Sequence, residues 1–171
     1  MLIPNNAHKI LDNEKIELKL DRMAFQALEL TFGDDDLVIL GIEPGGADLA
    51  QNLYQKIKSQ DSTKNIVFST VYLNKPEPLS EPVQIRDEID FNNKAIIIVD
   101  DVGNTGRTLF YVLQPLTHFH HKKIIIAVLV DRMHKTFPIN ADIIGFPIAT
   151  TRTEHIIVQF EKNRAEGAYL F

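Results

Sequence analysis

Apolar residues follow two patterns along the chain, and together they predict alternating strands and helices. Segments 37–42, 95–99 and 124–130 are continuously apolar, as expected of strands that are covered on both faces. Over residues 13–33, apolar positions instead recur every three or four residues, which predicts an amphipathic helix. The remaining predicted elements are helices at 47–59 and 105–116 and strands at 66–72, 143–146 and 156–160.

The order of these elements predicts an α/β fold, in which a Rossmann-like and mainly parallel sheet is flanked by helices. The expected ligand site of such a sheet lies in the loops at the carboxyl ends of its strands. Segment 73–90 has three prolines and little periodicity, which predicts a mobile loop or a loose hairpin, a candidate lid. We expect a single domain over residues 1–171, with a small hood formed by about 141–171 and the N-terminal segment.

Composition narrows the class of protein. The 171 residues are 44% hydrophobic, enough for one buried core. They include no cysteine, which excludes thiolate metal sites and is typical of a reducing compartment, so we expect a cytoplasmic protein. No apolar run approaches the roughly 18 residues of a membrane span, so no membrane partner is expected. The net charge of -5 argues against a nucleic-acid partner, because phosphate backbones attract basic surfaces.

The most informative segment is IIIVDDVGNTGRT, residues 96–108, where an apolar strand leads to two carboxylates and a glycine-containing turn that opens a helix. Free backbone amides converge where a helix begins, so the turn 105–108 suits a phosphate group. Asp100 and Asp101 are acceptors suited to the vicinal hydroxyls of a ribose whose 5′-phosphate lies in that turn. An acidic pair alone more often caps a turn, but the whole string is much more specific than its parts.

This segment resembles the phosphoribosyl pyrophosphate (PRPP) signature of the type I phosphoribosyltransferases, in particular that of the bifunctional pyrimidine-operon attenuator/uracil phosphoribosyltransferase family. The resemblance extends to residues 9–30, 37–46 and 126–160 and covers most of the chain. It implies the type I phosphoribosyltransferase fold, with a five-stranded, mainly parallel sheet, flanking helices, a flexible loop and a small hood that reads the base. It also implies a homodimer.

The same resemblance implies transfer of the phosphoribosyl group of PRPP to a nucleobase, uracil favoured, with release of pyrophosphate. Magnesium, held mainly by PRPP itself, is the implied cofactor. The residues that receive roles are Asp100 and Asp101 at the ribose hydroxyls, Asn104 near the base, Thr105, Gly106, Arg107 and Thr108 at the 5′-phosphate, Glu43, Pro44, Gly45 and Gly46 in the pyrophosphate loop, Lys75 in the flexible loop, and Arg132, Ile148 and Ala149 at the base.

Two positions depart from the family pattern and leave the activity open. Glu43 and Gly45 stand where the family usually has Lys and Arg, and repulsion in place of attraction at a pyrophosphate site could abolish turnover. One alternative is that Glu43 helps to hold magnesium, which prefers carboxylate and phosphate oxygens. Another is that the protein is a non-catalytic regulator that binds PRPP or a nucleoside monophosphate.

Other departures concern the base, RNA and metals. Asn104 can donate or accept a hydrogen bond but cannot act as a general base, so the base stays open between uracil, hypoxanthine and guanine. In the first helix, Asp21 and Phe25 interrupt the RNA-contacting pattern of the attenuators, which argues against an RNA attenuator. The histidines of segment 118–121 have no carboxylate at ligand spacing, so we expect no metal bound directly by them.

Overall fold

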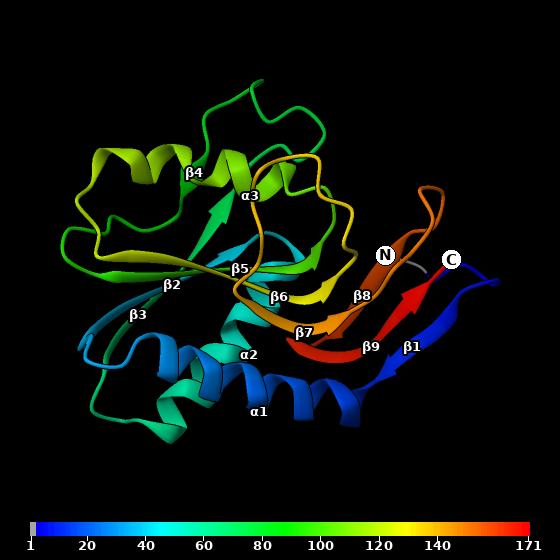
Figure 1. Cartoon of the computed structure of the whole chain (residues 1–171), viewed down its shortest axis with the longest axis horizontal. Helices are drawn as coiled ribbons and strands as arrows, with labels where there is room; N and C mark the ends of the chain where they lie inside the picture. The colour runs from blue at the N-terminus through cyan, green and yellow to red at the C-terminus, as the bar shows by residue number, and fades with distance from the viewer. Residues whose placement is uncertain (1–2) are drawn as a thin grey trace.

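Two β-sheets form the framework of the computed structural model, which describes residues 3–171 (Figure 1). The main sheet has the order β4 (Gln84–Ile85), β3 (Asn65–Tyr72), β2 (Asp36–Ile42), β5 (Ala95–Gly103), β6 (Lys123–Asp131) and β7 (Ile143–Pro147). Its strands run parallel except β4, which pairs antiparallel with β3. The smaller sheet, the hood, contains the antiparallel strands β1 (His8–Asp12), β9 (Arg164–Leu170) and β8 (Ile156–Glu161). The predicted α/β fold with a mainly parallel sheet is confirmed.

The three central strands of the main sheet correspond to the continuously apolar segments. β2, β5 and β6 are buried over most of their length, because helices cover both faces of the sheet. Leu40 of β2 lies beside Ile98 of β5, which lies beside Ile126 of β6. The carboxyl ends of these strands therefore lie along one edge of the sheet, on the side of the hood (Figure 1).

Helices cover the two faces of the main sheet unequally (Figure 1). The long helices α1 (Asn13–Leu30) and α2 (Gly45–Gln60) lie against one face, and the short α3 (Arg107–Val112) and the 3₁₀-helix η1 (Gln114–His118) lie against the other. α1 begins where the Asp12 side chain accepts a hydrogen bond from the Lys15 amide, a helix cap typical of aspartate. No helix within residues 3–171 is long and apolar enough to cross a membrane.

One predicted helix is divided in the structure, and segment 73–90 takes one of its two predicted forms, the loose hairpin. The single helix predicted over 105–116 is divided into α3 and η1, because Pro115 has no amide hydrogen with which to continue an α-helix. Segment 73–90, predicted as a mobile loop or a loose hairpin, pairs through β4 with Val71 and Tyr72 at the end of β3. The segment is therefore anchored to the main sheet close to the carboxyl ends of the strands.

β5 is longer than predicted, since it extends to Gly103 instead of ending at Val99. Its pairing with β6 continues to this end, where Gly103 lies beside Asp131. Asp100 and Asp101 therefore belong to the strand itself and not to the turn that follows it. Successive residues of a strand point to opposite faces of its sheet, so the two carboxylates leave β5 in different directions.

The members of the hood also differ from the prediction. β7, predicted as part of the tail that covers the site, pairs parallel with β6 at the edge of the main sheet. The other strands of the hood come from the two parts of the chain that were expected there, β1 from the N-terminal segment and β8 and β9 from the tail. Periodicity does not predict β1 and β9 as strands, because short strands with mixed polar and small residues give a weak pattern. β9 lies between β1 and β8, so the N-terminal segment and the tail meet in the hood.

Candidate functional site

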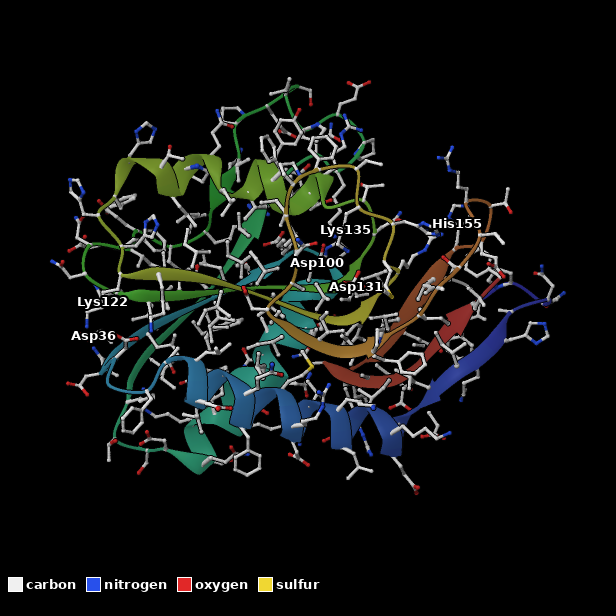
Figure 2. All side chains as sticks on the ribbon, viewed as in Figure 1. Asp36, Asp100, Lys122, Asp131, Lys135 and His155 are labelled. Carbon is white, nitrogen blue, oxygen red and sulfur yellow. The ribbon has the colours of Figure 1, made fainter. Side chains whose placement is uncertain are left out.

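A cavity of about 560 Å³, the main cavity, opens at the carboxyl ends of β2 and β5 and is bounded on its far side by β8 of the hood. Figure 2 shows two of its wall residues, Asp100 and His155, nearer the hood, whereas Asp36 and Lys122 lie at the opposite end of the sheet. The predicted site residues on its wall are Pro44, Gly45, Lys75, Asp100, Asp101, Asn104, Thr108 and Arg132. The parallel sheet thus brings residues from distant segments of the chain to one place.

Glycines allow the first turn of α2 to pack directly onto the end of β5. A Cβ atom at Gly45 would lie 2.4 Å from Asp101 Oδ2, and a Cβ atom at Gly46 would lie 2.6 Å from the Val99 carbonyl oxygen. Carbon and oxygen atoms do not approach so closely, so residues other than glycine require a shift here. The arginine that the family usually has at position 45 is therefore incompatible with the observed position of Asp101.

Asp100 is the buried carboxylate of the main cavity. Only 4% of the residue is exposed, and its Oδ1 lies 3.2 Å from Lys75 Nζ. Burial and the neighbouring Asp101 carboxylate raise the pKa of Asp100 to about 7, against the opposing effect of Lys75. Burial and Asp101 also raise the pKa of Asp48, which lines the same cavity from the first turn of α2.

The raised pKa of Asp100 predicts a pH-dependent stability. The folded protein holds this proton up to about pH 7, whereas an unfolded chain releases it near pH 4. The contribution of Asp100 to the free energy of unfolding therefore falls as pH rises from about 4 to about 7. We expect the Asp100→Asn variant to gain stability relative to the wild type across this window, as measured by urea unfolding of metal-free protein.

The control for this measurement is the Asp35→Asn variant, whose position is exposed at the opposite end of the sheet. Its free energy of unfolding should differ from that of the wild type by the same amount at every pH in the window. If the Asp100→Asn profile also runs parallel to that of the wild type, the folded state does not raise the pKa of Asp100.

A smaller cavity of about 160 Å³ adjoins the main cavity and shares Lys75, Asp100 and Thr108 with it. The predicted phosphate-binding residues Thr105, Gly106, Arg107 and Thr108 all line it. Gly106 has a φ of 82°, the left-handed region that favours glycine. α3 begins directly after it, and the first amides of a helix have no partner within the helix. The turn can therefore offer amide and hydroxyl groups to a small anion.

Glu43 lines none of the cavities described here, although Pro44 and Gly45 do. Arg86 donates two hydrogen bonds to its carboxylate, from Nε to Oε1 at 2.9 Å and from Nη2 to Oε2 at 2.8 Å. Thr70 Oγ1 donates a third to Oε1 at 2.7 Å. These contacts, that of Arg86 above all, lower the pKa of Glu43 to about 2. Both Glu43 oxygens are thus engaged outside the cavity, an arrangement that does not favour the magnesium-holding role left open by the sequence.

A third cavity, of about 520 Å³, lies between the loop after β6 and the residues before β8. Arg132 lines both this cavity and the main one. Its guanidinium is nevertheless engaged, because Nε donates to Thr150 Oγ1 and Nη2 to the Thr151 carbonyl, both at 2.9 Å. Lys135, on the same wall, is paired with the buried Asp131. Through these contacts within the protein, the two cations hold the loop after β6 in place.

Besides Glu43, three predicted residues lie away from these cavities. Gly46 is buried in the first turn of α2, against the end of β5. The Ile148 side chain packs against the main core, while its amide donates to the Asp131 carbonyl at 2.8 Å, and Ala149 is exposed. The wall opposite the β5 carboxylates is formed instead by His155 and residues 156–160 of β8.

Sequence reasoning did not assign Asp48 or the β8 wall to the site. Asp48 stands in the first turn of α2, where an acidic residue commonly stabilises the start of a helix, so its residue type alone does not indicate a cavity. Segment 156–160 is predicted as a strand, but only its antiparallel pairing with β9 places it across from the β5 carboxylates. For the β8 wall, the predicted hood above the site was the sequence signal that could have indicated it.

The oxygen atoms of the main cavity fit a metal ion that arrives with a phosphate ligand. Within the described range, residues 3–171, no group of three or more His, Asp or Glu residues could hold a metal by itself. Asp48, Asp100 and Asp101 nevertheless line the main cavity. Magnesium is commonly bound through one or two carboxylates together with substrate phosphates, so the acidic wall suits an ion that is held mainly by the ligand.

Comparison with known proteins gives matches over most of the chain. Residues 6–163 match the family model described as Phosphoribosyl transferase domain. The chain is 36% identical over 169 residues to Bifunctional protein PyrR of Macrococcus caseolyticus, a match that covers 90% of this chain and 91% of that protein. It is 37% identical over 160 residues to Bifunctional protein PyrR of Staphylococcus epidermidis, with coverage of 90% and 91%.

Solved structures share the fold at lower sequence identity. A hypoxanthine-guanine phosphoribosyltransferase from Bacillus anthracis has a TM-score of 0.72 and 18% identity, and the match covers 89% of this chain and 88% of that one. A hypoxanthine phosphoribosyltransferase from Staphylococcus aureus has a TM-score of 0.72 and 22% identity, with coverage of 88% and 80%. These likenesses show the fold alone.

Proposed function

The chain belongs to the phosphoribosyltransferase family, and from this premise we propose that it transfers the phosphoribosyl group of PRPP to a nucleobase, with uracil as the favoured base. The observation that carries the proposal is the continuity of the main and the smaller cavity. The carboxylates of Asp100 and Asp101 line the first, and the turn 105–108 lines the second. Acceptors for ribose hydroxyls thus stand directly beside donors for a 5′-phosphate, the arrangement that a ribose 5-phosphate unit requires.

In the proposed complex, PRPP lies along the end of β5. Its 5′-phosphate occupies the smaller cavity, where the turn 105–108 supplies amides and hydroxyls. The ribose hydroxyls donate to Asp100 and Asp101, and the diphosphate extends toward Pro44 and Gly45. Lys75, which is paired with Asp100, lines the same cavity as Pro44 and Gly45 and can exchange this carboxylate for a phosphate oxygen of PRPP.

The base is proposed to lie between Asn104 and the β8 wall. Asn104 lines both the main and the third cavity and offers an amide that can donate or accept a hydrogen bond. Uracil is favoured because the sequence resembles the pyrimidine family over most of its length, while the hypoxanthine enzymes share at most 22% identity among the structures compared above. Arg132 contributes by holding the 150–151 segment in place.

The proposed reaction is a displacement at C1 of the ribose. A ring nitrogen of the base forms the new C–N bond and gives up its proton to water or to the leaving pyrophosphate. The C1–O bond to the diphosphate breaks, and its electron pair leaves with pyrophosphate. Positive charge develops on the ribose, and the carboxylates of Asp100 and Asp101 stabilise it. Magnesium held by PRPP beside the acidic wall of Asp48, Asp100 and Asp101 would supply positive charge to the leaving group. Most of the remaining work is the positioning of the two reactants.

Titration calorimetry with PRPP and magnesium, followed by a pyrophosphate-release assay with uracil, hypoxanthine, guanine and adenine, tests the proposal. The expected result is PRPP binding and pyrophosphate release with one base, uracil above the others. Failure to bind PRPP would exclude the assigned site, and release with a purine alone would exclude the preference for uracil.

A second candidate function is a regulator that binds PRPP or a nucleoside monophosphate without turnover. The departures from the family pattern favour it, because Glu43 and Gly45 remove the usual cations from the pyrophosphate turn. Binding of PRPP without pyrophosphate release from any base would identify this function. An RNA attenuator is the third candidate, and salt-dependent RNA affinity would support it. A homodimer and a cytoplasmic location stay predictions from the sequence.

A further inference from the structure

We propose that Arg86 is a positioning residue of the pyrophosphate site, which neutralises Glu43 and holds its carboxylate away from the bound diphosphate. This inference rests on the proposed function and deepens it, since it explains how the chain can keep an acidic residue in its pyrophosphate turn. Arg86 lies outside the residues that the sequence assigned to the site, and it acts through Glu43 without lining any of the three cavities.

The position of Glu43 makes its charge relevant to the ligand. Pro44 and Gly45, the next two residues, line the main cavity. Neighbouring Cα atoms are at most about 3.8 Å apart, so the Glu43 backbone lies within about 8 Å of this wall. That distance is comparable to the screening length of about 8 Å at physiological ionic strength. An uncompensated carboxylate at position 43 would therefore repel a diphosphate in the cavity.

The guanidinium of Arg86 neutralises the negative charge of the Glu43 carboxylate. The two hydrogen bonds from Arg86 to Glu43 are parallel contacts between a guanidinium and a carboxylate, the geometry in which arginine binds carboxylates most specifically. The Glu43 amide is also fixed, because it donates to the Val71 carbonyl at 3.0 Å. The turn is thus held against β3 by its backbone and by its side chain.

Arg86 is itself held in place by β3. Its amide donates to the Thr70 carbonyl at 3.0 Å, and its guanidinium lies over the ring of Tyr72 at 5.3 Å from the centroid, a favourable cation–π contact. Thr70 contributes twice, because its hydroxyl also donates to Glu43. Since Arg86 follows β4 directly, the base of the 73–90 hairpin and the pyrophosphate turn are joined by one ion pair.

Removal of Arg86 should weaken binding of magnesium PRPP because the Glu43 carboxylate is then no longer neutralised. The loss of affinity should therefore disappear when Glu43 carries no charge. From Coulomb's law for one unit charge pair at about 8 Å and an effective dielectric near 20, we expect the Arg86→Ala variant to bind magnesium PRPP about thirtyfold more weakly at low salt. The Glu43→Gln variant should stay within about twofold of the wild type, and so should the double variant Arg86→Ala/Glu43→Gln. In 0.5 M salt, where the screening length is about 4 Å, the defect of Arg86→Ala should largely vanish.

Titration calorimetry of wild type, both single variants, the double variant and Arg86→Lys at low and high salt tests the inference. Recovery of affinity in the double variant and in Arg86→Lys supports the positioning role. If the double variant binds as weakly as Arg86→Ala, Arg86 contacts the ligand directly or supports the fold, and the inference is wrong. It is also wrong if Arg86→Ala binds like the wild type.

Two further measurements separate this inference from the proposed function and from loss of fold. If the wild type binds no magnesium PRPP, the proposed function fails and the inference fails with it, whereas wild-type binding without rescue overturns the inference alone. Thermal unfolding of every variant reports folding. If Arg86→Ala unfolds below the assay temperature, the Arg86→Lys variant and the double variant are compared instead. Wild-type affinity for magnesium PRPP in both variants supports the positioning role of Arg86. Weak binding by the double variant that does not change with salt overturns it.

Discussion

The Asp101→Asn variant is expected to lower kcat/KM for PRPP at least about tenfold. Asp101 lines the main cavity, and in the proposed complex it accepts hydrogen bonds from the ribose. A hydrogen bond to a charged group contributes about 1.5 to 3 kcal/mol, and each 1.4 kcal/mol corresponds to about tenfold. The carboxylate also faces the positive charge that develops on the ribose, an interaction that the neutral amide of asparagine does not replace.

The matched control is Asp35→Asn, which makes the same chemical change at an exposed position before β2, at the end of the sheet away from the cavity. Initial rates of pyrophosphate release give kcat and KM for both variants. Wild-type values are expected for Asp35→Asn. An unchanged kcat/KM in Asp101→Asn would show that this carboxylate does not touch PRPP, and the ribose site would have to be reassigned. Should the wild type release no pyrophosphate, the affinity for magnesium PRPP takes the place of kcat/KM.

The Gly106→Ala variant is expected to weaken PRPP binding at least about tenfold, through the loss of a charge-assisted hydrogen bond between the turn 105–108 and the 5′-phosphate. Gly106 has a φ of 82°, and a Cβ atom there would lie 3.4 Å from the Ile139 carbonyl oxygen. For an alanine, this left-handed conformation costs about 1 kcal/mol or more, so the backbone either shifts to another conformation or stays strained. Either response moves the amides that precede α3 relative to the smaller cavity.

Gly33→Ala is a closely matched control for this variant. Gly33 has nearly the same φ, 79°, but a Cβ atom there would meet nothing within 4 Å. It lies between α1 and β2, three positions before Asp36, which stands at the end of the sheet away from the hood (Figure 2). Both variants should therefore lose similar thermal stability, while Gly106→Ala alone loses affinity in calorimetry. Equal PRPP affinities for the two variants would show that the turn 105–108 does not hold the phosphate.

Local sequence patterns determined the main sheet and the turn that follows its central strand. The apolar segments 37–42, 95–99 and 124–130 became β2, β5 and β6, because a strand covered on both faces needs apolar side chains at every position. The string 96–108 placed two carboxylates and a glycine turn next to each other in the chain, and neighbours in sequence remain neighbours in any fold. For this reason the acidic end of β5 and the turn 105–108 could be identified without coordinates.

Contacts between distant segments decided the rest. The sequence shows Glu43 as an isolated acidic residue in a pyrophosphate turn, and only the pairing of β4 with β3 brings Arg86 to it from 43 positions away. In the same way, only the pairing of β8 with β9 makes segment 156–160 a wall of the main cavity, and only the pairing with β6 assigns β7 to the main sheet. Periodicity reports which face of an element is buried but not its partner, so the charge balance of the pyrophosphate turn depended on the tertiary structure.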